Sequence, residues 1–182
     1  MKKTILIFGL ISGVFCSVMM VITLPLAHRM GFDKAEILGY TSMVLMFLLV
    51  YFGIRSYRDN VCHGQITFVK AFAVGISIAL IGCVFYTATW EVIFFRFSHD
   101  FIDKYAAYTV EKLKASNASP AEVEAQVQKM AQFKKLYNNP VYNTAMTFLE
   151  PLPVGLAMTL LSAALLRRKS QAQTPAAVQV TS

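Results

Sequence analysis

Two glutamates stand at the edges of long apolar stretches of this sequence. Glu91 directly follows the uncharged run 71–90. Glu150 lies within another apolar stretch, immediately before Pro151 and close to Pro153. A pair of carboxylates can exchange protons or bind a cation, chemistry that acid–base enzymes and ion-coupled carriers both use. Because such pairs are common, the two residues alone do not name a reaction.

No other pattern in the sequence names a chemistry. The three cysteines form no CxxC pair, and the three histidines lack the HExxH spacing of zinc proteases. GxSxG, P-loop and dinucleotide-binding glycine patterns are also missing. We therefore expect no catalytic residue, no metal site and no cofactor, and predict that the protein is not an enzyme.

The composition is typical of a membrane protein. Of the 182 residues, 56% are hydrophobic and 15% are charged, and the mean hydropathy is +0.52. The charges are segregated between long uncharged runs, which a single soluble core would not require. We expect the lipid bilayer to be the main partner and residues 1–169 to form a single membrane domain.

The basic character of the chain fits the same interpretation. Seventeen Lys and Arg residues against ten acidic residues give a formal net charge of +7. Basic residues beside membrane spans orient a protein and contact anionic headgroups. Since no nucleic-acid motif accompanies the charge, we do not expect nucleic-acid binding.

Four apolar runs are long enough to cross a hydrocarbon core of roughly 30 Å. The first run is too long for a signal peptide and has no small-residue cleavage site, so it is expected to remain as a span. The predicted fold is all-α, a four-transmembrane-helix bundle with an external helical hairpin between spans three and four. The spans are expected near residues 4–27, 37–54, 71–92 and 144–166.

The distribution of basic residues predicts the orientation. With the N-terminus inside, the cytoplasmic segments hold eight basic residues and one acid, Asp59. The external loop 96–143 then holds seven basic and five acidic residues. Both termini are therefore predicted to be cytoplasmic, with a disordered cytoplasmic tail at 170–182. The eight cytoplasmic basic residues are Lys2, Lys3, Arg55, Arg58, Lys70, Arg167, Arg168 and Lys169.

The external loop contains signals for two helices. Ser119, Pro120 and Glu122 make a capping-box start, and Asn138-Asn139-Pro140 ends the helix that follows. Residues 114–118 are expected to form the turn of the hairpin. The apolar stripe of the hairpin is expected to pack on its partner helix or lie on the bilayer, and docking of another protein is the alternative.

The two glutamates are predicted to lie at similar depth. Counting at about 1.5 Å per residue from the cytoplasmic basic residues places both near the outer ends of spans three and four. An ionised side chain in the bilayer is costly unless it is paired. We therefore predict an outer-leaflet cluster, and the alternative is that each glutamate reaches headgroup water separately. The predicted cluster contains Glu91, Glu150 and Arg96, with Arg29 as a further basic partner and Trp90 and Tyr86 as interfacial aromatics.

Pro151 and Pro153 predict a break in the fourth span. Proline is tolerated in the first turn of a helix, where its missing N–H would have no partner. The fourth helix is therefore expected to start near Glu150, with this carboxylate capping its N-terminus, after a broken or kinked segment at 141–149. A broken helix facing a cavity is also a feature of transporter binding sites.

The segment between spans two and three is predicted to make a compact cytoplasmic turn. We expect this turn to fix the orientation of the spans in the membrane, and recognition of a partner is the alternative. The side chains that define this turn are Arg55, Tyr57, Arg58, Asp59 and Lys70.

Three segments resemble a known family. YFGIRSYRDN at 51–60, GQITFVKAFAVG at 64–75 and TFLEPLPVGL at 147–156 are similar to the domain-of-unknown-function 4199 family of bacterial integral membrane proteins. The resemblance covers most of residues 4–168. It implies a four-span protein of the bacterial inner membrane. Because that family has no assigned activity, the resemblance implies no catalytic role for any residue.

These observations lead to three hypotheses about function. The first is a structural or interaction component of the cell envelope, with a protein partner bound through the external hairpin. The second is a small transporter or ion-coupled carrier that uses Glu91 and Glu150. A membrane enzyme ranks last, since no catalytic constellation is recognisable. The sequence leaves the oligomeric state open.

Overall fold

The computed structural model describes residues 1–168, and for residues 27–30 it describes the backbone alone. The tail predicted at 170–182 lies outside the described residues. The regular structure of the described part is helical, which confirms the all-α prediction. The helices are α1 (Lys2–Met30), α2 (Phe32–Val61), α3 (Phe68–Phe97), α4 (Phe101–Ala115), α5 (Pro120–Tyr137), α6 (Pro140–Leu149) and α7 (Leu152–Leu166).

Four helical segments are long and apolar enough to cross a membrane, which confirms the predicted number of spans. The second and third are 30 residues long and extend past their apolar runs, because the helix continues into polar residues at its ends. The fourth consists of two helices, α6 and α7, in succession. The four segments are Lys2–Leu26, Phe32–Val61, Phe68–Phe97 and Pro140–Leu166.

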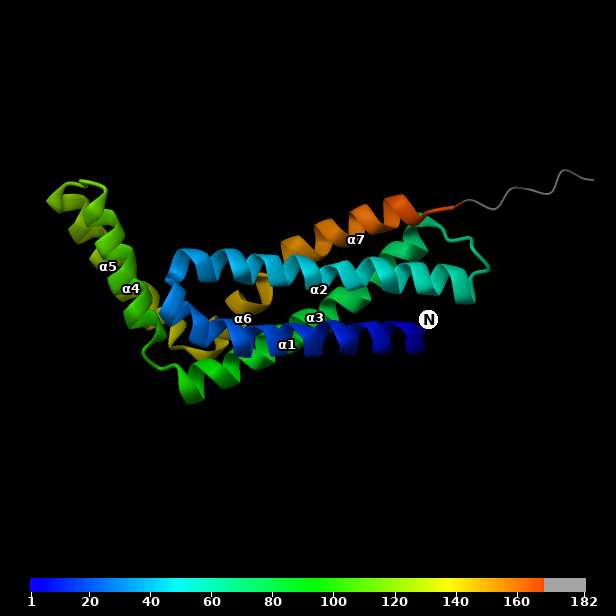
Figure 1. Ribbon diagram of the computed structural model, residues 1–182, viewed down its shortest axis with the longest axis horizontal. Coiled ribbons are helices and arrows are strands. Elements are labelled where there is room, and N and C mark those ends of the chain that lie inside the picture. Colours follow the sequence, from blue (N-terminus) through cyan, green and yellow to red (C-terminus); the bar gives the residue numbers. More distant parts are fainter. Residues whose placement is uncertain (169–182) are drawn as a thin grey trace, which may run out of the picture.

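The helices α1, α2, α3 and α7 pack together and form the bundle (Figure 1). Its core contains Phe47, Val50 and Ile54 of α2 and Ile78 of α3, all fully buried. The N-terminus and the end of α7 lie at the same end of the bundle, away from α4 and α5 (Figure 1). The bundle therefore has a terminal end and an opposite end, which we call the hairpin end.

Close contact between helices leaves little free space near the terminal end. A Cβ atom at Gly75 of α3 would lie 2.8 Å from Ile54 Cδ1 on α2 and 2.9 Å from Thr159 Cγ2 on α7. These distances are shorter than normal carbon–carbon contacts, so a Cβ atom at this position would force Ile54 and Thr159 to shift. Such packing is common where helices associate in membranes through small residues. The contact between α2, α3 and α7 is consequently close-packed at this level.

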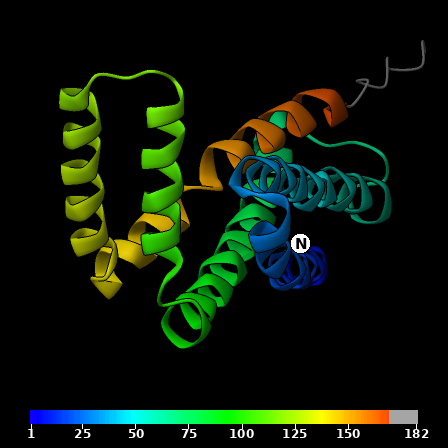
Figure 2. The same ribbon diagram turned by 60° about the vertical axis from the view of Figure 1, so that its left-hand side comes forward.

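The helices α4 and α5 form the predicted hairpin. They lie side by side (Figure 2), and together they cross the hairpin end of the bundle and project past it (Figure 1). At the start of α5, the Ser119 hydroxyl accepts the Glu122 N–H, and Glu122 Oε2 accepts the Ser119 N–H at 2.7 Å. This reciprocal pair is the predicted capping box. Acceptance of the Ser119 N–H also lowers the pKa of Glu122.

Contacts from α4 hold the hairpin against the start of α2. The Phe32 ring centroid lies 5.0 Å from that of Tyr108 and 5.6 Å from that of Tyr105. Beside these rings, Lys112 Nζ donates a hydrogen bond to Asp33 Oδ1 at 2.6 Å. This hydrogen bond raises the pKa of Lys112, which keeps its ammonium group charged. The position of the hairpin over the bundle is therefore set by specific contacts.

The close approach at Gly75 can be tested by adding one methyl group. Gly75→Ala places that group against Ile54 and Thr159, and overpacking of this kind costs about 1–3 kcal/mol. Gly39→Ala is the matched control, because a Cβ atom at Gly39 meets no other atom within 4 Å. Unfolding in mixed detergent micelles should show a clear loss of stability for Gly75→Ala alone. Equal effects of the two substitutions would contradict the packing described above.

Candidate functional site

The break between α6 and α7 positions Glu150. Pro151 and Pro153 have no N–H to donate to the carbonyl groups four residues earlier, so the helix cannot continue unchanged through them. The backbone of Glu150 stays helical, with φ −57° and ψ −52°, and its N–H donates to the Met146 carbonyl. Gly155 N–H then donates to the Pro151 carbonyl and begins the hydrogen bonding of α7.

Glu150 does not cap α7 as the sequence analysis predicted. Pro151 occupies the position before the first residue of α7, and no side chain caps that end. Glu150 instead follows the last residue of α6. Because the Glu150 backbone is still helical, its side chain projects sideways from α6 rather than back over the N-terminus of α7. The break was predicted correctly, and the role of the carboxylate was not.

The Glu150 carboxylate accepts a hydrogen bond from span three. Tyr86 Oη donates to Glu150 Oε2 at 2.9 Å, joining α3 to the break in the fourth span. Part of the Glu150 side chain remains exposed. A phenol that donates to a carboxylate oxygen fixes the direction of that side chain. Glu150 is therefore held in place while one side stays accessible.

Glu91 has a separate partner. Thr144 Oγ1 on α6 donates to Glu91 Oε1 at 3.0 Å. Both glutamates thus lie along the contact between α3 and the α6 region, although each binds its own hydroxyl group. Within the described residues, neither makes an ion pair with Arg96, which is exposed. The side chain of Arg29 lies outside the described residues.

Trp90 is buried rather than located at the bundle surface. Its ring centroid lies 5.9 Å from that of Phe94 and 5.1 Å from that of Phe101 at the start of α4. Phe94 in turn meets Tyr137 at the end of α5, with 5.3 Å between centroids. This row of rings joins span three to both helices of the hairpin. Burial raises the pKa of Tyr137, which keeps its phenol neutral.

A polar residue that the sequence analysis missed connects the hairpin to α6. Asn143 is fully buried; its Nδ2 donates to the Tyr137 carbonyl at 3.1 Å, and its Oδ1 accepts from Thr147 Oγ1 at 3.1 Å. The Asn139 side chain accepts the N–H groups of Val141 and Tyr142 and caps α6. The Asn-Asn-Pro sequence indicated the end of α5, but it gave no signal for the buried amide that follows.

A cavity of about 540 Å³ lies between the hairpin and the bundle, and we call it the hairpin cavity. Residues from α1 through α6 line it, including the carboxylates of Asp33, Glu36 and Glu150. Aromatic rings form much of its wall. Phe32, Tyr105 and Tyr108 make one group of rings in contact. The other tyrosines of the wall are Tyr40, Tyr86 and Tyr137. Neither Glu91 nor Arg96 lines the cavity, so the structure associates Glu150 with Glu36 rather than with these residues.

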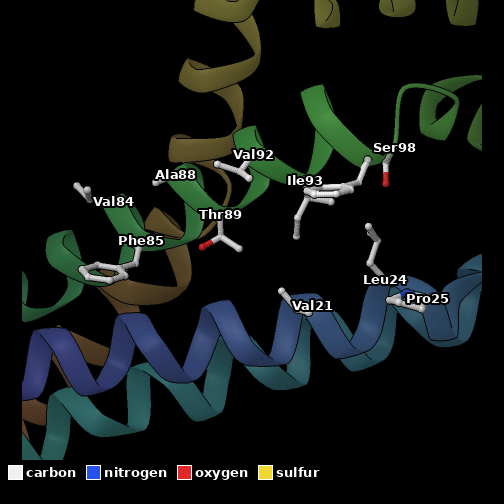
Figure 3. A pocket seen from close by; sticks show the side chains of 11 residues that line it. Val21, Leu24, Pro25, Val84, Phe85, Ala88, Thr89, Val92, Ile93 and Ser98 are labelled. Carbon is white, nitrogen blue, oxygen red and sulfur yellow. The ribbon is translucent and has the colours of Figure 1, made fainter.

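A second cavity of about 930 Å³ is an apolar groove between α1 and α3. Figure 3 shows Val21 and Leu24 of α1 on one side of it and Thr89 and Ile93 of α3, which point toward α1, on the other. Two hydroxyl groups nearby, Ser17 Oγ and Thr89 Oγ1, bind each other at 2.7 Å. Because the groove lies along two membrane spans and offers few polar groups, it suits lipid acyl chains.

The turn between α2 and α3 is held by local contacts. Asp59 accepts from Arg58 Nε at 2.7 Å and lies 3.6 Å from Arg55 Nε. Tyr57 is buried, and the backbone N–H of Lys70 donates to the Thr67 side chain that caps α3. The side chains predicted to define this turn therefore make contacts within the turn itself. The ion pairs of Asp59 with Arg55 and Arg58 are exposed to solvent, and ion pairs of this kind add little stability.

Comparison with known proteins identifies the family. The family described as "Protein of unknown function (DUF4199)" matches residues 7–168. The chain belongs to this family. The match confirms the resemblance seen in the sequence, and it covers all four spans of this DUF4199 protein, the hairpin and the break at Glu150. Searches of curated proteins and of solved structures found no match.

The contact between Tyr86 and Glu150 gives a direct prediction. Tyr86→Phe removes the donor and leaves the ring, and loss of a hydrogen bond to a partly exposed carboxylate should cost about 1 kcal/mol. Tyr40→Phe is the control, since Tyr40 lines the same cavity and its hydroxyl makes no hydrogen bond to any other described residue. Thermal unfolding in detergent should show a lower midpoint for Tyr86→Phe only. Identical midpoints for both variants would mean that the contact does not stabilise the fold.

Proposed function

We propose that this DUF4199 protein is a non-enzymatic, multi-pass protein of the bacterial inner membrane that binds a small solute in the hairpin cavity. The observation that carries the proposal is the cavity itself. Its volume of about 540 Å³ is within the range of roughly 300–1,000 Å³ typical of small-molecule sites. It also combines apolar walls with a few convergent polar groups, as such sites do.

The positions of the glutamates support binding in this cavity. Tyr86 orients the Glu150 carboxylate, and part of this side chain remains exposed. Glu150 can therefore contact a solute in the cavity without a change in the backbone. Glu36 lines the same space from α2. Glu91 lies outside the cavity lining. The carrier hypothesis from the sequence named Glu91 and Glu150 as the binding carboxylates. The cavity lining instead supports Glu36 and Glu150 in this role.

The close packing around Gly75 supports binding rather than free conduction. Three helices meet there with little room for a methyl group, so the contact between α2, α3 and α7 offers no passage for a solute at this level. Uptake through the bundle would require the helices to move, as alternating-access carriers do. A receptor that senses the solute from one side requires no such movement.

An interaction role remains a second candidate, because the far part of the hairpin is exposed. No described residue of α5 is buried, and Val127 on this helix is 48% exposed. The hairpin base is fixed to α2 and α3, so the exposed part is presented in a defined position. A photo-crosslinker at position 127 should capture one defined protein in intact cells. Absence of a reproducible product would count against this role.

We further propose that the hairpin end faces outward and that both termini are cytoplasmic. The excess of basic residues at the terminal end supports this orientation. Alkaline phosphatase, which becomes active only after export, should be active when fused after residue 118 in the hairpin turn. A fusion after residue 168 should be inactive. The reverse pattern of activity would contradict the orientation.

The cavity proposal can be tested before the solute is known. A library of small metabolites should contain members that raise the thermal midpoint of the purified protein by mass action. Gly39→Phe should abolish these shifts, because position 39 lines the hairpin cavity and has open space around its Cβ. Gly39→Ala is the matched control and should keep them. Shifts that persist in Gly39→Phe, or a library without any hit, would contradict solute binding in this cavity.

A further inference from the structure

The charge of the hairpin cavity is unbalanced. Its lining includes three carboxylates, Asp33, Glu36 and Glu150, and one ammonium group, Lys112. Lys112 is paired with Asp33 at 2.6 Å. Among the described lining residues, Glu36 and Glu150 therefore have no cationic partner. Like charges that share one partly enclosed space repel, and a cation between them would relieve this repulsion.

The walls of the cavity also favour a cation. The face of an aromatic ring carries partial negative charge and attracts ammonium groups within about 6 Å of its centroid. Tyr40 and Tyr86 contribute such rings near the two carboxylates, Tyr40 from the same helix as Glu36 and Tyr86 through its hydrogen bond to Glu150. Aromatic and carboxylate groups together are the usual surroundings of bound organic ammonium ions.

The protein already shows this chemistry at one end of the cavity. The Lys112 ammonium group lies 5.7 Å from the centroid of the Tyr108 ring and 2.6 Å from Asp33 Oδ1. Lys112 is thus an alkylammonium ion bound by one ring and one carboxylate. The part of the cavity around Tyr86 and Glu150 also combines an aromatic ring with a carboxylate. No ammonium group of a described residue is paired with the carboxylate there.

The size and donor set indicate an organic cation rather than a metal ion. Calcium requires six to eight oxygen ligands at 2.3–2.6 Å. Within the described residues, no group of three or more His, Cys, Asp or Glu side chains is arranged to hold a metal. The cavity volume of about 540 Å³ is also far larger than a dehydrated metal ion needs. An ammonium ion with an apolar substituent would use both the carboxylates and the rings.

We propose that the hairpin cavity binds a small organic ammonium ion between the carboxylates of Glu36 and Glu150, with its apolar part against the tyrosine rings. This inference rests on the proposed function, because it names the chemical class of the solute. The carboxylates select the positive charge, and the rings and the volume of the cavity select an apolar substituent. The Lys112–Asp33 pair lies in the lining of the same space.

Three probes of similar size and different charge can test this class. They are phenethylammonium, neutral 2-phenylethanol and anionic phenylacetate. Trp90, the one tryptophan of the chain, reports on binding through its fluorescence, since its ring contacts Phe101 in the cavity wall. The full-length protein in lipid nanodiscs should bind phenethylammonium at least roughly tenfold more tightly than the alcohol, with phenylacetate the weakest.

Substitutions should locate the positive charge. Glu150→Gln keeps an acceptor for Tyr86 and removes the charge, and Glu36→Gln does the same on α2. Each should weaken phenethylammonium binding roughly tenfold or more and leave 2-phenylethanol binding unchanged. Glu124→Gln on the exposed surface of α5 is the matched control and should change neither affinity.

The outcomes separate this inference from the proposed function. If the alcohol binds as tightly as phenethylammonium, or if Glu36→Gln and Glu150→Gln have no effect, the ammonium proposal is wrong while the cavity still binds solutes. Tightest binding of phenylacetate would also overturn it. If none of the probes binds, the ammonium class is rejected, and the library screen with Gly39→Phe decides separately whether the cavity binds any solute.

Discussion

The break in span four at Glu150, where Tyr86 of α3 donates a hydrogen bond to the carboxylate, is the constraint on which the cavity wall depends. It requires the two prolines after Glu150, because a continuous fourth helix would carry this side chain along a different face. The break leaves α6 as a short separate helix that packs on α3 and begins directly after the hairpin. Span four therefore contributes a close-packed helix to the bundle and a differently directed helix to the cavity wall.

The hairpin turns this arrangement into a partly enclosed space. Phe32, Tyr105 and Tyr108 fix α4 to α2, while Asn143 fixes the end of α5 to α6. Between these two attachments the hairpin spans the end of the bundle, and the cavity lies beneath it. Aromatic contacts and a buried amide thus join the hairpin to a second apolar cluster, which contains Trp90, Ile93, Phe94 and Ile102. They leave polar groups facing the cavity without filling it.

Local signals in the sequence predicted the elements, whereas contacts between elements escaped prediction. Apolar runs of sufficient length identified the spans, the prolines identified the break, and Ser119 with Glu122 identified the start of α5, since each depends on neighbours in the chain. The partner of Glu150 could not be predicted, because it depends on how α3 and α6 rotate about their axes. Arg96 illustrates the difference: it follows Glu91 by five residues, whereas residues three or four apart share a helix face. Glu36 and Tyr40 were missed because only the folded hairpin shows that they line a cavity.

In the proposed orientation, Glu150 is accessible from the outer face of the membrane through the hairpin cavity rather than exposed to lipid. Labelling of Glu150→Cys tests this most directly, in a protein whose Cys16, Cys62 and Cys83 have been replaced by alanine. A membrane-impermeant maleimide applied to the outer face should react with position 150. A cysteine at Leu160, a residue of α7 with an exposed side chain inside the predicted span, should remain unlabelled. Reaction of position 150 from the cytoplasmic side only, or no reaction from either side, would contradict the account.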